Sequence, residues 1–150
     1  MTVKLRLATP TDAPACAAIV NDWIDAKDWL PRLHSNAAIE EMIRTAIPMR
    51  EVWIAGDPVQ GYLSFDVEAG KIMGLYTRVP GRGVGKALVD HVKNGRTSVL
   101  LWSHAANTRA HAFYRREGFV ETGRNESGGD GIPEIRMEWR RSDGAGLATG

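Results

Sequence analysis

Glycine occupies three alternate positions in the segment 81–85, and two basic residues, Arg82 and Lys86, stand among and after them. Glycine lets the backbone approach a ligand closely, and a helix that begins here would leave its first N–H groups without intrahelical acceptors. Such amides, together with the two basic side chains, would form a site suited to a phosphate group. The simpler interpretation, a glycine-rich turn with solvated basic residues, is left open by this segment alone.

The spacing of these residues separates the phosphate-binding motifs that compete for the segment. A P-loop requires Gly, four residues and then Gly-Lys-Ser/Thr, but Pro80 stands at the first glycine position and Ala87 follows Lys86. A dinucleotide-binding fingerprint requires Gly-x-Gly-x-x-Gly/Ala, whereas the two available registers reach Lys86 or Leu88 at the last position. The spacing therefore excludes both motifs.

The remaining pattern resembles the acyl-CoA pyrophosphate loop of the GNAT superfamily of N-acetyltransferases, which reads Gln/Arg-x-x-Gly-x-Gly/Ala between a strand and a helix. The resemblance extends over most of the chain and includes a second, independent segment. In that segment the family spacing is matched by Asn107, Ala110, Phe113-Tyr114 and Gly118-Phe119. The resemblance implies a mixed sheet that opens between its fourth and fifth strands to admit the cofactor.

One position departs from the family pattern. If Gly83 and Gly85 are the motif glycines, Pro80 occupies the position of the family's Gln or Arg. A register that starts at Arg78 satisfies the pattern literally, but it shifts the start of the helix by two residues. We prefer the first register because it places the apolar residues after Gly83 on the buried face of the helix.

The resemblance implies that acetyl-CoA is the co-substrate, and no metal is expected. The pantetheine arm would lie along the edge of the strand that ends at Thr77, and the pyrophosphate would bind the amides of residues 82–86. Asn107 resembles the family residue that hydrogen-bonds the pantetheine arm, and a helix cap is the alternative or additional role for it. The expected cofactor contacts are Leu75, Tyr76, Thr77, Arg82, Gly83, Val84, Gly85, Lys86 and Asn107.

Tyr114 occupies the position of the family's general-acid tyrosine, so the resemblance implies that it protonates the departing CoA thiolate. An unperturbed phenol, with a pKa of about 10, is protonated at neutral pH. The ring also falls on the apolar stripe of its expected helix, which favours packing as the alternative role. For the base that deprotonates the amine, the sequence leaves open a water chain or one of Asp66, Glu68, His34 and, more weakly, His104.

The segment 29–34 combines an aromatic ring, a cation and an imidazole in one non-helical stretch. Such a concentration is typical of a binding loop, because loops carry many of the residues that contact ligands. We therefore expect Trp29, Arg32 and His34 to contact the acceptor substrate. The alternative is a packed connector in which Trp29 faces the core.

The elements that must position these residues follow from hydrophobic periodicity. After a strand at 3–7, two amphipathic helices are expected, with apolar stripes at 16–24 and 39–47, and Ser35 can cap the second. Further strands are expected at 52–55, 59–67, 72–77, 98–102, 119–122 and 135–139, and further helices at 83–94 and 107–116.

This order of elements predicts an α/β (α+β) fold. With the resemblance, we expect a single GNAT-like domain over residues 1–141, in which a mixed, mostly antiparallel sheet is flanked by helices. Residues 142–150 hold three glycines and one large apolar residue, so we expect them to form a flexible tail.

The composition indicates one folded, soluble domain. Hydrophobic residues make up 43% and charged residues 25% of the 150-residue chain, close to globular averages, which excludes disordered and fibrous classes. The net charge of +1 is too balanced to favour a nucleic acid as partner. Cys16 stands alone, so it forms no intramolecular disulfide, and its place on an apolar stripe predicts a core position.

The sequence also indicates a location. No apolar run approaches the roughly 20 residues of a membrane span. The amino terminus interleaves Lys4 and Arg6 with its apolar residues and so lacks the continuous apolar region of a secretory signal. We therefore expect a cytoplasmic protein with no membrane partner.

We expect an N-acetyltransferase (EC 2.3.1 class) in which a primary amine of a small molecule attacks acetyl-CoA directly. Pro80 and the lack of a carboxylate or His on the strand before the loop favour an alternative, a non-catalytic acyl-CoA-binding or regulatory domain. Acetylation of a protein amino terminus or lysine is a third interpretation. Homodimers are common in the resembled family, so a second copy of the chain is a further candidate partner.

Overall fold

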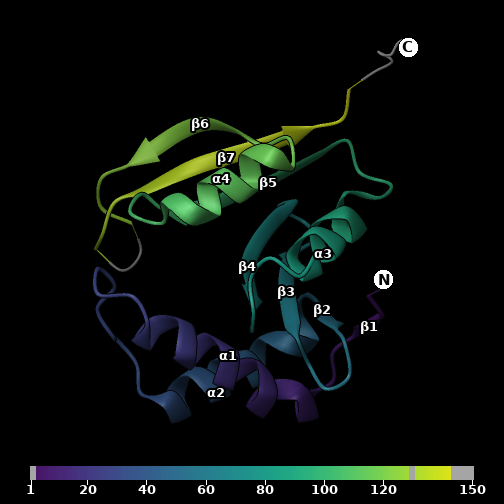
Figure 1. The fold of residues 1–150 in the computed structure, drawn as a ribbon, viewed down its shortest axis with the longest axis vertical. Helices are drawn as coiled ribbons and strands as arrows, with labels where there is room; N and C mark the ends of the chain where they lie inside the picture. Colours follow the sequence, from purple (N-terminus) through teal and green to yellow (C-terminus); the bar gives the residue numbers. More distant parts are fainter. Residues whose placement is uncertain (1–2, 129–130, 143–150) are drawn as a thin grey trace. The chain divides into compact units, whose positions relative to one another are not determined.

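The structure is a computed structural model that describes residues 3–128 and 131–142. Within these ranges the chain forms seven strands, four α-helices and two short 3-10 helices, in the order β1-η1-α1-α2-η2-β2-β3-β4-α3-β5-α4-β6-β7 (Figure 1). The chain divides into two compact units, Met1–His91 and Val92–Gly150. None of the described helices is long and apolar enough to cross a membrane.

The strands of the first unit form an antiparallel group in the order β1-β2-β3-β4. Their bounds are Leu5–Leu7, Glu51–Ala55, Gly61–Asp66 and Lys71–Thr77. Gly61 pairs with Thr77, so the start of β3 lies beside the end of β4. The register shifts between Ser64 and Phe65, where Met73 of β4 is the extra residue of a bulge.

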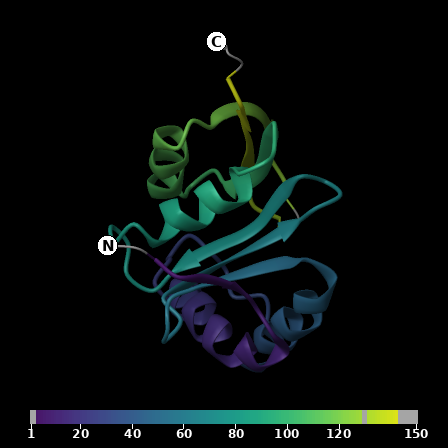
Figure 2. The same ribbon diagram turned by 90° about the vertical axis from the view of Figure 1, so that its right-hand side faces the viewer.

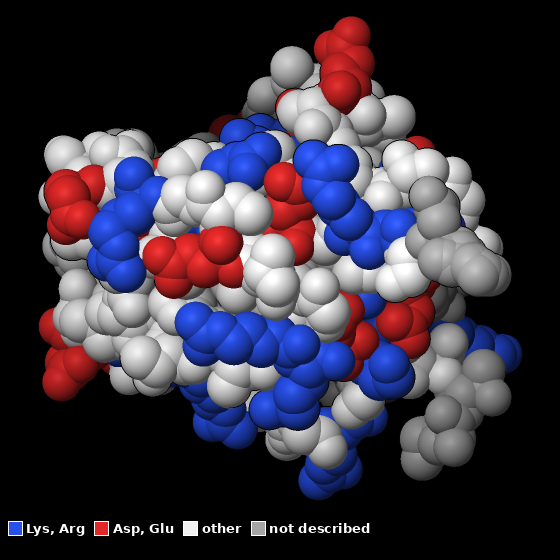
Figure 3. Space-filling model, turned by 90° about the horizontal axis from the view of Figure 1, so that it is seen from above, with Lys and Arg blue, Asp and Glu red and all other residues white. Residues whose placement is uncertain are grey.

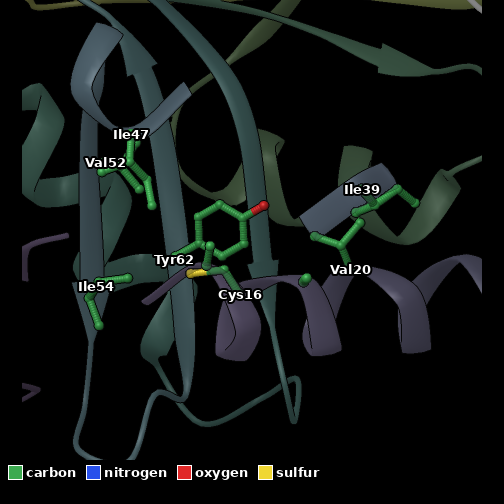
Figure 4. Close-up of a cluster of buried hydrophobic side chains, with 9 residues drawn as sticks. Cys16, Val20, Ile39, Ile47, Val52, Ile54 and Tyr62 are labelled. Atoms are coloured by element: carbon green, nitrogen blue, oxygen red, sulfur yellow. The ribbon is translucent and has the colours of Figure 1, made fainter. Parts of the chain in front are cut away.

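Helices α1 (Ala13–Asp25) and α2 (Asn36–Ala46) cover one side of these strands, as the purple and blue helices of Figure 2 show. The 3-10 helix η1 (Pro10–Asp12) leads into α1, and η2 (Ile47–Met49) follows α2. Ser35 caps α2, because its hydroxyl accepts a hydrogen bond from the Ala38 amide at 3.1 Å. The apolar stripes of both helices meet the strands in one core cluster (Figure 4), which comprises Ala13, Cys16, Ala17, Val20, Ile39, Ile47, Val52, Ile54 and Tyr62.

Helix α3 (Val84–Lys93) covers the opposite side of the same strands (Figure 2). Side chains alternate along a strand, so the neighbours of Val52 and Ile54 point away from the α1 side. Trp53 accordingly contacts His91 of α3, with 4.1 Å between ring centroids. The apolar face of α3 is buried and comprises Val84, Leu88, Val89 and Val92.

The second unit consists of a three-stranded antiparallel group and one helix. Its strand order is β5-β7-β6, with bounds Ser98–His104, Glu134–Arg140 and Val120–Asn125. Helix α4 (Thr108–Arg116) follows β5 directly. The buried residues of β5 and β7 alternate with less buried ones, and they are Val99, Leu101, Ile135 and Met137.

The fold class predicted from the sequence is confirmed: a mixed α/β arrangement of mostly antiparallel strands flanked by helices. The largest difference in bounds is at β6, which extends three residues beyond the expected end at 122. β5 extends two residues beyond 102, and β1 and β3 each begin two residues later than expected. The domain extent of 1–141 stays a prediction. Of the expected tail at 142–150, residues 143–150 lie outside the described part of the chain.

Cys16 provides a direct test of this core. Its side chain is fully buried, and burial raises the pKa of its thiol to about 12. We therefore predict that iodoacetamide leaves the native protein unmodified at about pH 8, whereas the denatured protein reacts as a free thiol. Mass spectrometry of both samples checks this, and equal labelling rates in the two states would contradict the core position.

Candidate functional site

The loop between β4 and α3 owes its shape to two glycines. Gly81 and Gly83 have φ values of +81° and +78°, in the left-handed region that side-chain-bearing residues rarely adopt. A Cβ at either position would meet no atom within 4 Å, so the backbone conformation, and not crowding, requires glycine there. The space around both residues is open to a ligand.

Helix α3 begins at Val84, directly after this loop. Its first hydrogen bond runs from the Ala87 amide to the Gly83 carbonyl at 3.1 Å. The amides of residues 84–86 precede this bond and lack acceptors within the helix. The helix start is within one residue of the expected position, which favours the register with Gly83 and Gly85 as motif glycines.

Positive charge accompanies these amides. Arg82 is exposed and makes no hydrogen bond or ion pair with another described residue. Lys86 Nζ lies 3.4 Å from Asp90 Oδ2, one helical turn further on. Left-handed glycines, helix amides and a guanidinium together fit a phosphate or pyrophosphate group.

Gly61, which sequence reasoning did not single out, holds this helix start close to the strands. A Cβ at Gly61 would lie 2.8 Å from the Tyr76 carbonyl oxygen and 2.9 Å from Val84 Cγ1. Only glycine permits this approach without a shift of β4 or α3. A glycine at the start of an expected strand was the available signal, since it often marks a close approach of backbone.

The predicted cofactor strand residues lie at the end of β4, immediately before the glycine loop. Thr77 faces the α3 side, since its Cγ2 would be 3.3 Å from a Cβ at Gly61. Tyr76 points to the opposite side, where its ring stacks on Tyr62 at 5.6 Å and meets Trp23 edge-on at 5.4 Å. Burial raises the pKa of the Tyr76 phenol, which stays protonated at neutral pH.

The predicted acceptor loop is fastened to helix α1 by Arg32. Its guanidinium donates to Asn21 Oδ1 at 2.9 Å and to Asp25 Oδ1 at 2.8 Å, and Asn21 is buried. His34 is exposed at the end of the loop, and its carbonyl accepts from Arg32 at 3.1 Å. Arg32 therefore positions the loop, and its contact with substrate stays a prediction.

Trp29 is half-buried and meets Trp23 edge-on, with 6.0 Å between ring centroids. Since Trp23 also contacts Tyr76, the structure joins a predicted acceptor residue to a predicted cofactor strand through a third ring. Sequence reasoning placed Trp23 on an apolar core stripe and missed this role. Its spacing of six residues from Trp29 was the available signal.

Asn107 and Tyr114 belong to the second unit. Asn107 caps α4, because its Oδ1 accepts from the Ala110 amide at 3.2 Å; the pantetheine contact stays a prediction. Tyr114 is 7% exposed, and its ring packs edge-on against Phe113 and Phe119 at 5.2 and 5.4 Å. The packing role is thus present, and the acid role stays a prediction compatible with it.

Of the base candidates, Asp66 and Glu68 lie at the wrong end of the hairpin. Asp66 pairs with Lys71, and its Oδ1 accepts from the Ala69 amide at 3.2 Å in the turn. Thr77 is six residues further along β4, about 20 Å at 3.3 Å per residue. Both carboxylates are therefore far from the glycine loop.

The histidines of the second unit form a structural contact. His111 is buried, and its Nε2 lies 2.9 Å from the His104 carbonyl oxygen. Burial lowers the pKa of the His111 imidazole, so a neutral ring that donates its Nε2 proton to this carbonyl accounts for the contact. His111 thereby links α4 to the end of β5.

Charges on the face seen in Figure 3 are mixed, with acidic side chains interrupting basic ones. Several arginines are paired with glutamates, such as Arg136 and Arg140, which lie 3.3 and 3.0 Å from Glu138. Among the residues that the structure describes, no group of three His, Cys, Asp or Glu side chains could hold a metal ion.

Known proteins resemble this chain in sequence and in fold. Residues 48–121, which include the glycine loop, match the family model of the acetyltransferase (GNAT) domain. The peptidyl-lysine N-acetyltransferase YjaB of Salmonella typhimurium is 28% identical over 131 residues, covering 84% of this chain and 89% of that protein.

Two solved structures show the same fold. The solution structure of apo-form YjaB from Escherichia coli has a TM-score of 0.76 at 23% identity, covering 93% of this chain and 98% of that one. The PaiA N-acetyltransferase from Thermoplasma acidophilum, solved in complex with coenzyme A, has a TM-score of 0.68 at 19% identity, covering 94% and 100%.

The glycine loop makes a prediction about binding. Gly85→Glu places a carboxylate in the first turn of α3, where it would repel a pyrophosphate. We predict that acetyl-CoA binding is lost while the fold is retained, and that Gly85→Ala, which the family pattern admits, keeps binding. Isothermal titration calorimetry of both folded variants checks this. Wild-type affinity in Gly85→Glu would remove the loop from the site.

Proposed function

Because the chain belongs to the GNAT superfamily of acetyltransferases, we propose that it transfers the acetyl group of acetyl-CoA to the side-chain amine of a protein lysine. The class of reaction, acyl transfer, follows from the family, whereas the identity of the acceptor is our proposal. The glycine loop that leads into the first turn of α3 is the observation that carries the cofactor assignment. The acetyltransferase family model and the relatives named as acetyltransferases favour a transferase over the non-catalytic alternative.

The names of the relatives favour a lysine of a protein over the small amine expected from the sequence. The relatives from Salmonella and Escherichia coli are both named peptidyl-lysine N-acetyltransferases.

Each chemical task is assigned to residues of this chain. The amides of residues 84–86 and Arg82 would hold the pyrophosphate, and the end of β4 at residues 75–77 would align the pantetheine arm. When bound, acetyl-CoA supplies a thioester that the neutral amine attacks, with CoA thiolate as the leaving group. The Tyr114 phenol would then donate its proton to that thiolate.

The acceptor class is tested by a matched set of substrates. Acetyl-CoA is supplied with a lysine peptide whose amino terminus is blocked, with a lysine-free peptide whose amino terminus is free, and with a panel of small amines. Thiol release is followed, and the products are identified by mass spectrometry. We expect turnover with the lysine peptide.

The other outcomes of this assay reassign the function. Turnover with small amines alone would restore the small-molecule acceptor, and turnover with the free amino terminus alone would identify an amino-terminal acetyltransferase. If no acceptor releases thiol although acetyl-CoA binds tightly, the transferase proposal is wrong for these acceptors.

Tyr114→Phe tests the general acid, since it removes one hydroxyl and keeps the ring that packs on Phe113 and Phe119. If the phenol protonates the thiolate, kcat should fall by roughly 10²-fold, with little change in acetyl-CoA affinity. Steady-state kinetics over a range of pH checks this, with loss of the high-pH limb expected in the variant.

Tyr62→Phe is the matched control, because it removes a buried hydroxyl from the core cluster and should leave turnover unchanged. A wild-type rate and pH profile in Tyr114→Phe would show that the tyrosine only packs.

A further inference from the structure

Three aromatic rings form a continuous wall on the α1 side of strand β4. Trp23 is the middle ring, 6.0 Å from Trp29 and 5.4 Å from Tyr76, and both contacts are edge-to-face. The three residues are half-buried, and Tyr76 also packs against the core cluster. We call Trp23, Trp29 and Tyr76 the aromatic wall. It runs from the predicted acceptor loop to the predicted cofactor strand.

An ammonium group of the chain itself, that of Lys27, already lies against the aromatic wall. Lys27 Nζ lies 5.9 Å from the centroid of a Trp23 ring, within the range of a cation–π contact. Lys27 lies two residues past the end of α1, and its side chain reaches back to the Trp23 ring. A lysine ammonium on this ring is the same chemical group that a lysine acceptor would bring.

The charge around the wall suits a cation as well. Asp22 and Asp28 are exposed on either side of Lys27, and neither forms an ion pair with another described residue. Asp25 is engaged by Arg32, which holds the loop that carries Trp29. The negative charge of these carboxylates attracts a cation, and the faces of the aromatic rings supply the direct contact with it.

We propose that the aromatic wall binds the ammonium group of the acceptor lysine, and that Lys27 occupies this position on Trp23 in the free enzyme. The inference rests on the proposed function and names how the acceptor is recognised. Binding selects a cationic side chain beside the end of β4. The bound ammonium then passes its proton to water, and the neutral amine attacks the thioester carbon. Incoming lysine must displace Lys27 from the ring.

The test measures binding without turnover. Two peptides are compared by calorimetry, one with trimethyllysine, which keeps the positive charge but cannot be acetylated, and one with norleucine, its neutral counterpart. We expect the trimethyllysine peptide to bind at least roughly tenfold more tightly to the wild-type enzyme. Lys27→Met should strengthen its binding severalfold, because the competing ammonium is gone.

Trp23→Leu should abolish the preference for the cation, and Trp23→Phe should restore part of it. Trp29→Leu, on the loop, serves as the second wall variant if Trp23→Leu does not fold. Trp53→Leu is the matched control, since this tryptophan packs on His91 on the other side of the strands and should leave the preference intact.

The outcomes separate this inference from the function itself. Equal binding of both peptides, or a preference that survives in the folded wall variants, would overturn the inference even if lysine peptides are acetylated. A preference that depends on Trp23 would support the inference even if the acetylation assay fails. In kinetics, the wall variants should raise KM for a lysine peptide and leave kcat nearly unchanged.

Discussion

The contact between Val84 and Gly61 fixes where helix α3 begins, and the candidate cofactor site depends on that position. Val84 is 8% exposed, and Leu88, Val89 and Val92 are fully buried. Burial of each such side chain stabilises the fold by about 1.5–3 kcal/mol, so a shift of the helix that exposed them would lose several of these contributions. The missing Cβ of Gly61 lets the helix approach. The amides of the first turn are therefore held in place before any ligand arrives, which reduces the cost of binding.

Strand β4 lies between the proposed cofactor site and the proposed acceptor site, because consecutive residues of a strand face opposite sides. Thr77 faces α3 and the glycine loop, whereas Tyr76 faces α1 and the aromatic wall. In the proposed reaction, one strand end would touch the cofactor and the acceptor at once. The Arg78 amide bonds to the Gln60 carbonyl at 2.8 Å, which carries the antiparallel pairing one step past the end of β4. The loop that follows contains Gly81 and Gly83, whose backbone conformation is left-handed.

The sequence predicted most of the fold because the signals for it are local. Ser35 as a helix cap, the apolar stripes of α1 and α2, and the start of α3 are all set by residues within a few positions of each other. The glycine loop was also predictable, since its residue types and spacing admit few alternatives. By contrast, the bulge at Met73 and the close approach at Gly61 depend on neighbouring strands and helices. The same limit applies to the hydrogen bonds from the Arg32 guanidinium to Asn21 and Asp25, which depend on how the loop packs on α1.

The central claim, that the first turn of α3 binds the pyrophosphate of CoA, is tested most directly by NMR of the backbone amides. A ¹H–¹⁵N spectrum of the wild-type protein is recorded with and without CoA, and with pantetheine, which lacks the pyrophosphate. If the first turn of α3 binds the pyrophosphate, the amide resonances of residues 83–86 shift strongly with CoA and little with pantetheine. Resonances that stay in place while CoA binds and shifts amides elsewhere in the chain would contradict this site.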